Sequence, residues 1–185
     1  MNEPTVLRRP VASVIGSARP SLADEQLAFE LGRLLVDHGF RIVTGGLAGV
    51  MAGASRGARS SRLWVDGTII GILPTYDAGD ANPWVDIAIP TGMNHARNAL
   101  VVSAGDVIIA IGGGAGTLSE LGLAWSLGKG VIIVGDGGWA PHFAGVPIDS
   151  RRSDVAHAAA TAADACRLAV QLAGRSEAPS DEFPL

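Results

Sequence analysis

Short apolar runs alternate along this chain with longer stretches in which apolar residues recur at helical spacing. The short runs are rich in Val and Ile, which is typical of parallel strands buried on both faces. We predict strands at residues 11–15, 41–44, 68–73, 85–89, 106–111 and 130–134. We predict helices at residues 22–38, 48–60, 92–104, 117–127 and 154–173. This alternation predicts an α/β fold: a Rossmann-like doubly wound, mainly parallel sheet with helices on both faces.

The chain length indicates the domain organisation. At 185 residues the chain suits one domain with a buried core. We therefore predict a single Rossmann-like nucleotide- or phosphate-binding domain at residues 1–174, followed by a polar C-terminal tail at 175–185. Two irregular connections, residues 74–84 and 135–152, are long enough to cover a ligand.

Composition and charge narrow the classes of partner. Hydrophobic residues make up 48% and charged residues 17% of the chain, as expected for a compact soluble protein. The formal net charge is −4 and Lys129 is the only lysine, so we expect no nucleic-acid partner. Every apolar run is interrupted well before roughly 18 residues, so we expect no membrane span. The single cysteine, Cys166, indicates a reducing compartment, and we expect a cytoplasmic protein.

Glycine-rich turns follow three of the predicted strands. In an open parallel sheet, ligands bind beyond the carboxyl ends of the strands, where helix N-termini offer free N–H groups to anions. Gly16 and Ser17 form the first turn and offer a close backbone approach and a hydroxyl. The alternative for this turn is an ordinary loop before a helix capped by Ser21.

The second turn contains Gly45 and Gly46 and leads into a helix with interior glycines at Gly53 and Gly57. Each interior glycine costs a helix about 1 kcal/mol relative to alanine. Something must offset this cost, either close packing on the sheet or close approach to a ligand. The sequence leaves both interpretations open.

The third turn is the clearest candidate for an anion site. A buried apolar strand leads into three consecutive glycines and then into the start of a helix. The open N–H groups of such a turn suit a phosphate, so we expect contacts from Gly113, Gly114, Gly116 and Thr117. The spacing is not that of the dinucleotide fingerprint, and no lysine follows as it does in a Walker loop.

Two charged residues near these turns are candidates for chemistry. Glu120 stands three residues after Thr117, which is a capping-box spacing in which the carboxylate returns to a backbone N–H. The alternative is a carboxylate that faces the ligand as a hydrogen-bond acceptor or an acid–base group. Arg97 is either a solvated helix arginine or a guanidinium at a phosphate site.

Other reactive side chains form no recognisable pattern. The four histidines are His38, His95, His142 and His157. They have neither metal-ligand spacing nor a cysteine cluster beside them, so we predict no metal site. Neither Ser17 nor Ser119 stands in a G-x-S-x-G nucleophile elbow. The tryptophans are expected in core or loop packing, with Trp84 or Trp139 as candidates to stack on a ring.

The turns and charged residues occur in the order of a known family. Gly16-Ser17, residues 44–51, His95-Ala96-Arg97 and the run 113–120 together resemble the LONELY GUY family, over roughly residues 11–134. The resemblance implies a homodimer or higher oligomer that binds nucleoside monophosphates and hydrolyses the N-glycosidic bond to base and ribose 5-phosphate. No cofactor is required for that reaction.

The resemblance also implies roles for individual residues. Arg97 and Glu120 match the family's catalytic pair, in which a carboxylate would stabilise positive charge on the ribose and an arginine would hold phosphate or ribose hydroxyls. The implied substrate-binding residues are Gly16, Ser17, Gly45, Gly46, Arg97, Gly113, Gly114, Gly116, Thr117 and Glu120.

Two departures from the family pattern support an alternative function. Gly112 stands where the family has proline, and Asn98 stands where it has lysine, which removes a charge near the site. This stretch also resembles molybdenum-cofactor carrier proteins, which bind a phosphorylated pterin without chemistry. The sequence therefore predicts a hydrolase of AMP or a cytokinin-type nucleotide or, alternatively, a non-catalytic carrier or sensor of a phosphorylated cofactor such as the molybdenum pterin.

Overall fold

The protein is built around one parallel β-sheet of seven strands in the order β4-β3-β2-β1-β5-β6-β7. The computed structural model describes residues 8–150 and 152–174, so the predicted tail at 175–185 lies outside the described residues. The strands are β1 (Val11–Gly16), β2 (Arg41–Thr44), β3 (Ile69–Leu73), β4 (Ile87–Pro90), β5 (Val107–Ile111), β6 (Gly130–Val134) and β7 (His157–Ala159).

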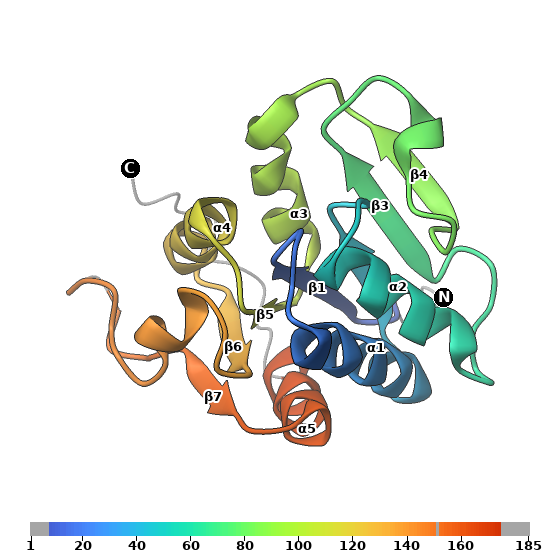
Figure 1. The fold of residues 1–185 in the computed structure, drawn as a ribbon. Coiled ribbons are helices and arrows are strands. Elements are labelled where there is room, and N and C mark those ends of the chain that lie inside the picture. The colour runs from blue at the N-terminus through green and yellow to red at the C-terminus, as the bar shows by residue number, and fades with distance from the viewer. Residues whose placement is uncertain (1–7, 151, 175–185) are drawn as a thin grey trace, which may run out of the picture.

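Helices cover both faces of the sheet (Figure 1). One face packs against α1 (Leu22–Asp37), α2 (Val50–Ser60) and α5 (Ala162–Ala173). The other face packs against α3 (Asn98–Ala104) and α4 (Ala115–Ser126). Short 3-10 helices are η1 (Ala78–Asp80), η2 (Asn94–Arg97) and η3 (Ala140–Phe143). The predicted Rossmann-like doubly wound α/β fold is therefore confirmed.

The centre of the sheet positions the ends of the strands that matter for function. All five residues of β5 are fully buried, because this strand lies between β1 and β6 and under helices on both faces. The strand order reverses between β1 and β5, and Gly16 pairs with Ile111 at their carboxyl ends. In open α/β sheets such a reversal leaves a crevice where ligands bind.

Two predicted helices differ from the structure. The segment 154–173 is not one helix, because residues His157–Ala159 pair with β6 as strand β7 and α5 begins only at Ala162. The Thr161 side chain accepts a hydrogen bond from the Asp164 N–H and so caps α5. Alanine has high helix propensity, but the open edge of β6 supplies backbone hydrogen bonds that override it.

The predicted helix at residues 92–104 is split in the same way. Residues Asn94–Arg97 form the 3-10 helix η2, and the α-helix α3 begins at Asn98. Gly92 and Asn94 have positive φ angles of 63° and 51°, which a continuous α-helix does not allow.

The glycines of α2 are explained by packing, although against a helix rather than the sheet. A Cβ on Gly57 would lie 1.8 Å from the carbonyl oxygen of Phe29 in α1, and a Cβ on Gly53 would lie 3.1 Å from that of Glu25. From the opposite side, a Cβ on Gly32 would lie 2.1 Å from the carbonyl oxygen of Ala54. The backbones of α1 and α2 therefore approach so closely that Gly32 and Gly57 have no room for a side chain and Gly53 has little.

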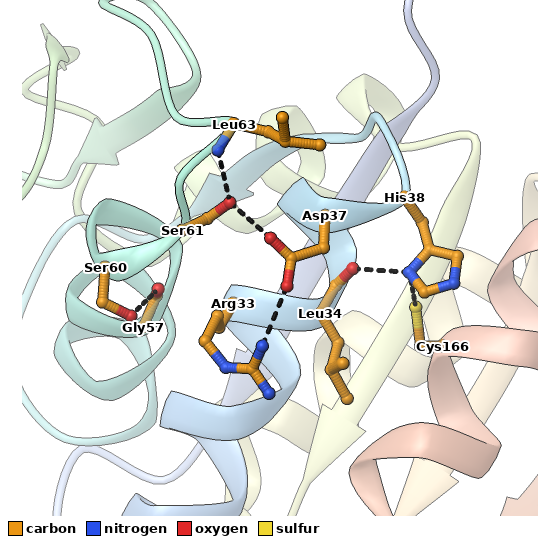
Figure 2. Close-up of polar contacts among 9 residues, drawn as sticks. All are labelled: Arg33, Leu34, Asp37, His38, Gly57, Ser60, Ser61, Leu63 and Cys166. Atoms are coloured by element: carbon orange, nitrogen blue, oxygen red, sulfur yellow. Dashed lines mark hydrogen bonds and ion pairs between the residues drawn. The ribbon is translucent and has the colours of Figure 1, made fainter.

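A polar cluster at the C-terminal end of α1 ties α1 to α2 and to α5 (Figure 2). The Asp37 carboxylate accepts hydrogen bonds from Arg33 at 2.9 Å and from the Ser61 hydroxyl at 2.6 Å. The buried Cys166 thiol lies 3.4 Å from His38 Nδ1. Burial, and then the charge of Asp37, raise the pKa of this thiol to about 11, so Cys166 is an unreactive part of the core.

Candidate functional site

The three glycine-rich turns lie together at the carboxyl ends of β1, β2 and β5. At Gly16 the chain passes so close to β5 that a Cβ there would lie 2.3 Å from the Ile111 carbonyl oxygen. The Val50 N–H at the start of α2 donates to the Ser17 carbonyl at 2.9 Å, which joins the first turn to the second. Gly49, with φ of 71°, passes equally close to that carbonyl. Sequence spacing alone did not reveal these contacts.

The first turn also behaves as the ordinary loop that the sequence offered as an alternative. The Ser17 hydroxyl accepts a hydrogen bond from the Arg19 N–H at 3.0 Å. The Ser21 hydroxyl caps α1 by accepting from the Asp24 N–H at 3.1 Å. The Ser17 hydroxyl proton stays available to donate to a ligand.

The third turn presents the start of α4 to open space. Gly112 and Gly113 have φ angles of 59° and 105°, and Gly114 is the N-cap residue and provides no side-chain cap. Beyond their chain neighbours and α4 itself, no described atom lies within 4 Å of the Cβ positions of Gly114 and Gly116. The first N–H groups of an α-helix have no partner within the helix, so this opening is suited to an anion.

The structure excludes the capping-box interpretation of Glu120. Helix α4 begins at Ala115, so Thr117 is its third residue and cannot be the N-cap. The Thr117 side chain instead packs against Gly113, where an added Cβ would lie 2.4 Å from Thr117 Cβ. Glu120 is thus free to turn its carboxylate toward Arg97.

Arg97 and Glu120 form a buried ion pair between η2 and α4. Their residues are only 9% and 6% exposed, and Arg97 Nη1 lies 3.4 Å from Glu120 Oε1. The guanidinium also lies against the second turn, because a Cβ on Gly45 would be 2.4 Å from Arg97 Nη2. Within the described residues, Arg97 Nε is buried and has no hydrogen-bond partner. One donor of the guanidinium therefore remains to be satisfied.

Two residues that the sequence did not assign to the site hold Arg97 in place. Asn98 accepts a hydrogen bond from Arg97 Nη1 at 2.6 Å and donates to the Ser119 hydroxyl at 3.0 Å. Ser119 in turn donates to the Gly116 carbonyl at 2.7 Å. The helical period would have flagged Asn98 as a buried polar residue, because Val101 and Val102 follow at i+3 and i+4. The amide at position 98 thus links Arg97 to the first turn of α4.

The electrostatics of the pair follow from burial. Burial raises the pKa of the Glu120 carboxyl to about 7, although the charge and hydrogen bond of Arg97 partly oppose the shift. Burial lowers the pKa of the Arg97 guanidinium, and the Glu120 charge opposes that shift. Near neutral pH the carboxyl can therefore gain or lose a proton beside a permanently charged guanidinium.

Gly46 is a predicted site residue, but its backbone N–H and carbonyl already have hydrogen-bond partners within the protein. Its N–H donates to the Thr44 hydroxyl at 3.0 Å, and its carbonyl accepts from the Asn82 N–H at 2.8 Å and the Asn82 side-chain amide at 3.1 Å. Gly46 therefore joins the second turn to the 74–84 connection. Its φ of 73° fits the glycine found there.

The 135–152 connection lies against the third turn. The Trp139 N–H donates to the Gly113 carbonyl at 3.0 Å. Gly138, with φ of 70°, passes so close that a Cβ would lie 2.4 Å from the same carbonyl oxygen. Residues 138 and 139 were not among the predicted ligand contacts, apart from the suggestion that Trp139 could stack on a ring.

Residues 8–150 and 152–174 contain neither a metal-binding cluster nor a helix suited to a membrane. Within these ranges no three His, Cys, Asp or Glu side chains gather as a metal-binding group. No helix within the same ranges combines the length and the apolar character needed to cross a bilayer.

Comparison with models of protein families shows the family to which the chain belongs. The model of the SLOG cluster4 family matches residues 9–165. The chain belongs to the SLOG cluster4 family. The predicted resemblance is thus confirmed at the level of LOG-like Rossmann proteins, whereas the P-G-G-x-G-T element of LONELY GUY proteins is not shown. Gly112 has φ of 59°, and proline is restricted to about −65°, so proline does not fit this position.

Solved structures similar to this SLOG cluster4 protein include two proteins that are named for the molybdenum cofactor. The molybdenum cofactor binding protein of Rippkaea orientalis is 33% identical, with a TM-score of 0.80, over 90% of this chain and 98% of that one. The molybdenum cofactor carrier protein of Chlamydomonas reinhardtii is 32% identical, with a TM-score of 0.76, over 90% and 100%.

Two further comparisons are less informative about function. An uncharacterized protein of Archaeoglobus fulgidus is 37% identical over 118 residues, which cover 64% of this SLOG cluster4 protein and 75% of the relative. DNA processing protein A of Helicobacter pylori is 18% identical, with a TM-score of 0.62, over 88% of this chain and 81% of that one. Similarity at that level reflects the fold alone.

Proposed function

We propose that this protein binds a phosphorylated pterin-type cofactor such as the molybdenum cofactor and carries it without chemical change. The observation that carries the proposal is the buried Arg97 Nε without a partner among the described residues, in a side chain that pairs with Glu120 of α4. Its similarity to cofactor carriers over nearly its whole length supports the choice of ligand. A phosphate oxygen would satisfy the donor that the protein leaves unpaired.

The ligand contacts follow from the geometry of the turns. The phosphate would accept hydrogen bonds from the first N–H groups of α4, at Gly114, Gly116 and Thr117, and from Arg97. Gly16 and Ser17 would line the same anion site from the first turn, with the Ser17 hydroxyl as a further donor. The absence of side chains at the glycines lets the ligand approach the backbone.

Cofactor protection tests this proposal. Molybdenum cofactor freshly released from a molybdoenzyme would be incubated with the protein, and the surviving cofactor measured by its ability to restore an apo-molybdoenzyme. We expect several-fold slower decay with the wild type and loss of that protection in Arg97→Met. Arg62→Met, at an exposed arginine, is the matched control and should protect normally. Equal decay with and without the wild type would exclude a carrier.

A second candidate function is hydrolysis of a nucleoside 5′-monophosphate, and one observation favours it. The Glu120 carboxyl, with its pKa raised to about 7, lies beside Arg97 as an acid–base group would. Incubation with AMP and measurement of free adenine separates the two functions. Adenine release that disappears in Glu120→Gln would establish the hydrolase, whereas a carrier releases none.

We also propose that the protein assembles as a homodimer through the outer face of α3 and α4. Glu120 is the only charged residue of these two helices, and it is buried. A groove of about 750 Å³ lies against both helices, lined by small residues, Ala96, Ala99, Gly122 and Ser126 among them, and by the larger His95, Leu123, Trp125 and Ile148. Small, uncharged side chains let a second copy's helices pack closely, whereas a solvated helix normally carries charges.

Insertion of a charge tests the dimer. Ala99→Glu places a carboxylate in the groove, and Ala163→Glu places one on the exposed side of α5 as the matched control. Analytical ultracentrifugation should show a dimer for the wild type and for Ala163→Glu, and a monomer for Ala99→Glu. A wild-type monomer, or a dimer that persists in Ala99→Glu, would exclude this interface.

A further inference from the structure

Trp139 differs from the other three tryptophans in what covers its ring. A guanidinium lies over each of the others: Arg59 over Trp64 at 3.9 Å, Arg152 over Trp125 at 4.6 Å and Arg56 over Trp84 at 5.8 Å. Trp139 is 57% exposed. Its indole lies near the His142 imidazole, with 5.2 Å between the ring centroids and 50° between the ring planes. Of the two tryptophans that the sequence suggested for stacking, only Trp139 keeps a largely open indole.

The backbone of Trp139 is fixed to the third turn. Its N–H donates to the Gly113 carbonyl at 3.0 Å. The preceding residue, Gly138, has φ of 70° and leaves no room for a Cβ against that carbonyl. The backbone around Trp139 is therefore held against the turn that leads into α4.

An exposed indole beside an anion site has a clear chemical use. A ligand that covers a large exposed apolar ring removes its surface from water, which favours binding. A flat heteroaromatic ring attached to a bound phosphate can stack on an indole, and such stacking tolerates any ring that offers a π face. The other half of a phosphorylated pterin is a ring of this kind.

We propose that Trp139 stacks on the fused heteroaromatic ring of the ligand whose phosphate binds the third turn. This inference rests on the proposed function, because it needs a ligand at that turn. Recognition of the ligand is then divided between two groups of residues. The glycine turn and Arg97 bind the phosphate, and Trp139 selects ligands that carry a planar ring.

The experiment compares two probes that differ in the ring. Neopterin monophosphate carries both the ring and the phosphate, and glycerol 3-phosphate carries only the phosphate. Affinities would be measured by calorimetry for the wild type, Trp139→Ala and Trp139→Phe. Tyr76→Ala removes another aromatic ring, 87% exposed, and serves as the matched control.

We expect Trp139→Ala to weaken neopterin monophosphate binding roughly 5- to 150-fold, the range found when an aromatic stacking partner is truncated. Trp139→Phe should retain most of the affinity, and glycerol 3-phosphate should bind all variants equally. Neopterin monophosphate should also quench part of the wild-type tryptophan emission, and that part should be missing in Trp139→Phe. A purely structural role for Trp139 would not produce this ring-dependent pattern.

Three other outcomes would overturn the inference. If Trp139→Ala weakens both probes equally, Trp139 positions the turn and does not stack. If it weakens neither while the wild type binds both, the ring is held elsewhere and the proposed function stands. If the wild type binds neither probe, the proposed function itself fails, and the inference fails with it.

Discussion

One donor of the buried Arg97 guanidinium, Nε, has no hydrogen-bond partner among the described residues. A buried donor without a partner costs about 1–3 kcal/mol, and a buried ion pair also loses the hydration of both charges. Glu120 and Asn98 satisfy Nη1, and Nε stays unpaired. An arrangement that costs folding free energy in this way is expected where a ligand completes it.

Glu120 makes the stability depend on pH. Its pKa is about 7 in the folded protein and near 4.5 in the absence of burial. The folded state therefore binds this proton more tightly than the unfolded state. The stability from this group is full below about pH 4.5 and is lost as the pH rises to about 7, by up to about 3 kcal/mol.

We predict that Glu120→Gln removes this loss, because an amide does not titrate. Urea unfolding between pH 4.5 and 8 measures it as the difference in slope between wild type and variant. Glu30→Gln, at an exposed position on α1, should keep the wild-type slope. Parallel profiles for wild type and Glu120→Gln would show that the burial of Glu120 does not shift its proton affinity.

At the scale of elements, glycine allows two helices to touch. The backbones of α1 and α2 meet at Gly32 and Gly57, where ideal Cβ atoms would overlap the facing carbonyls, and they pass close at Gly53, where a Cβ would lie 3.1 Å from the Glu25 carbonyl oxygen. Each interior glycine weakens its own helix, and the close packing offsets that loss. This contact holds the start of α2 against the first turn, where Val50 binds the Ser17 carbonyl.

We predict that Gly57→Ala destabilises the protein by roughly 1–3 kcal/mol, because the added methyl meets the Phe29 backbone rather than a movable side chain. Gly116→Ala is the matched control, since its Cβ enters open space within α4 and should stabilise the ligand-free protein by up to about 1 kcal/mol. Chemical denaturation of both variants measures the difference. Equal stabilities would mean that α1 and α2 can separate without cost.

At the scale of the whole molecule, the sheet order brings the site together. Strands β2, β1 and β5 are adjacent, so the turns that follow them meet at the carboxyl edge of the sheet. The first and third of these turns are about a hundred positions apart in the sequence. A ligand bound across these turns contacts the folded state alone. Binding should therefore stabilise the entire fold.

We predict that neopterin monophosphate at about 100 times its Kd stabilises the protein by about 2.7 kcal/mol, which corresponds to a rise in Tm of roughly 5–11 °C for a chain of this length. Differential scanning calorimetry with and without the compound measures this rise. Arg97→Met should melt at the same temperature in both conditions. A rise that persists in Arg97→Met would place the bound compound elsewhere.

Local sequence patterns suffice to predict the parallel sheet, six of its strands, the three glycine turns, and Arg97 and Glu120 as candidate site residues. These features follow from local patterns, because buried strands must be apolar and close approaches require glycine. Strand β7 was missed because an alanine-rich segment favours a helix until the edge of β6 pairs with it.

The contacts between these residues depend on the packing of the folded chain. The Glu120 capping box was excluded because α4 begins two residues before Thr117. The Arg97–Glu120 pair, the Asn98 link and the docking of Trp139 on Gly113 join residues far apart in the chain. Such contacts depend on how helices and turns pack across the sheet, and no local propensity specifies that packing.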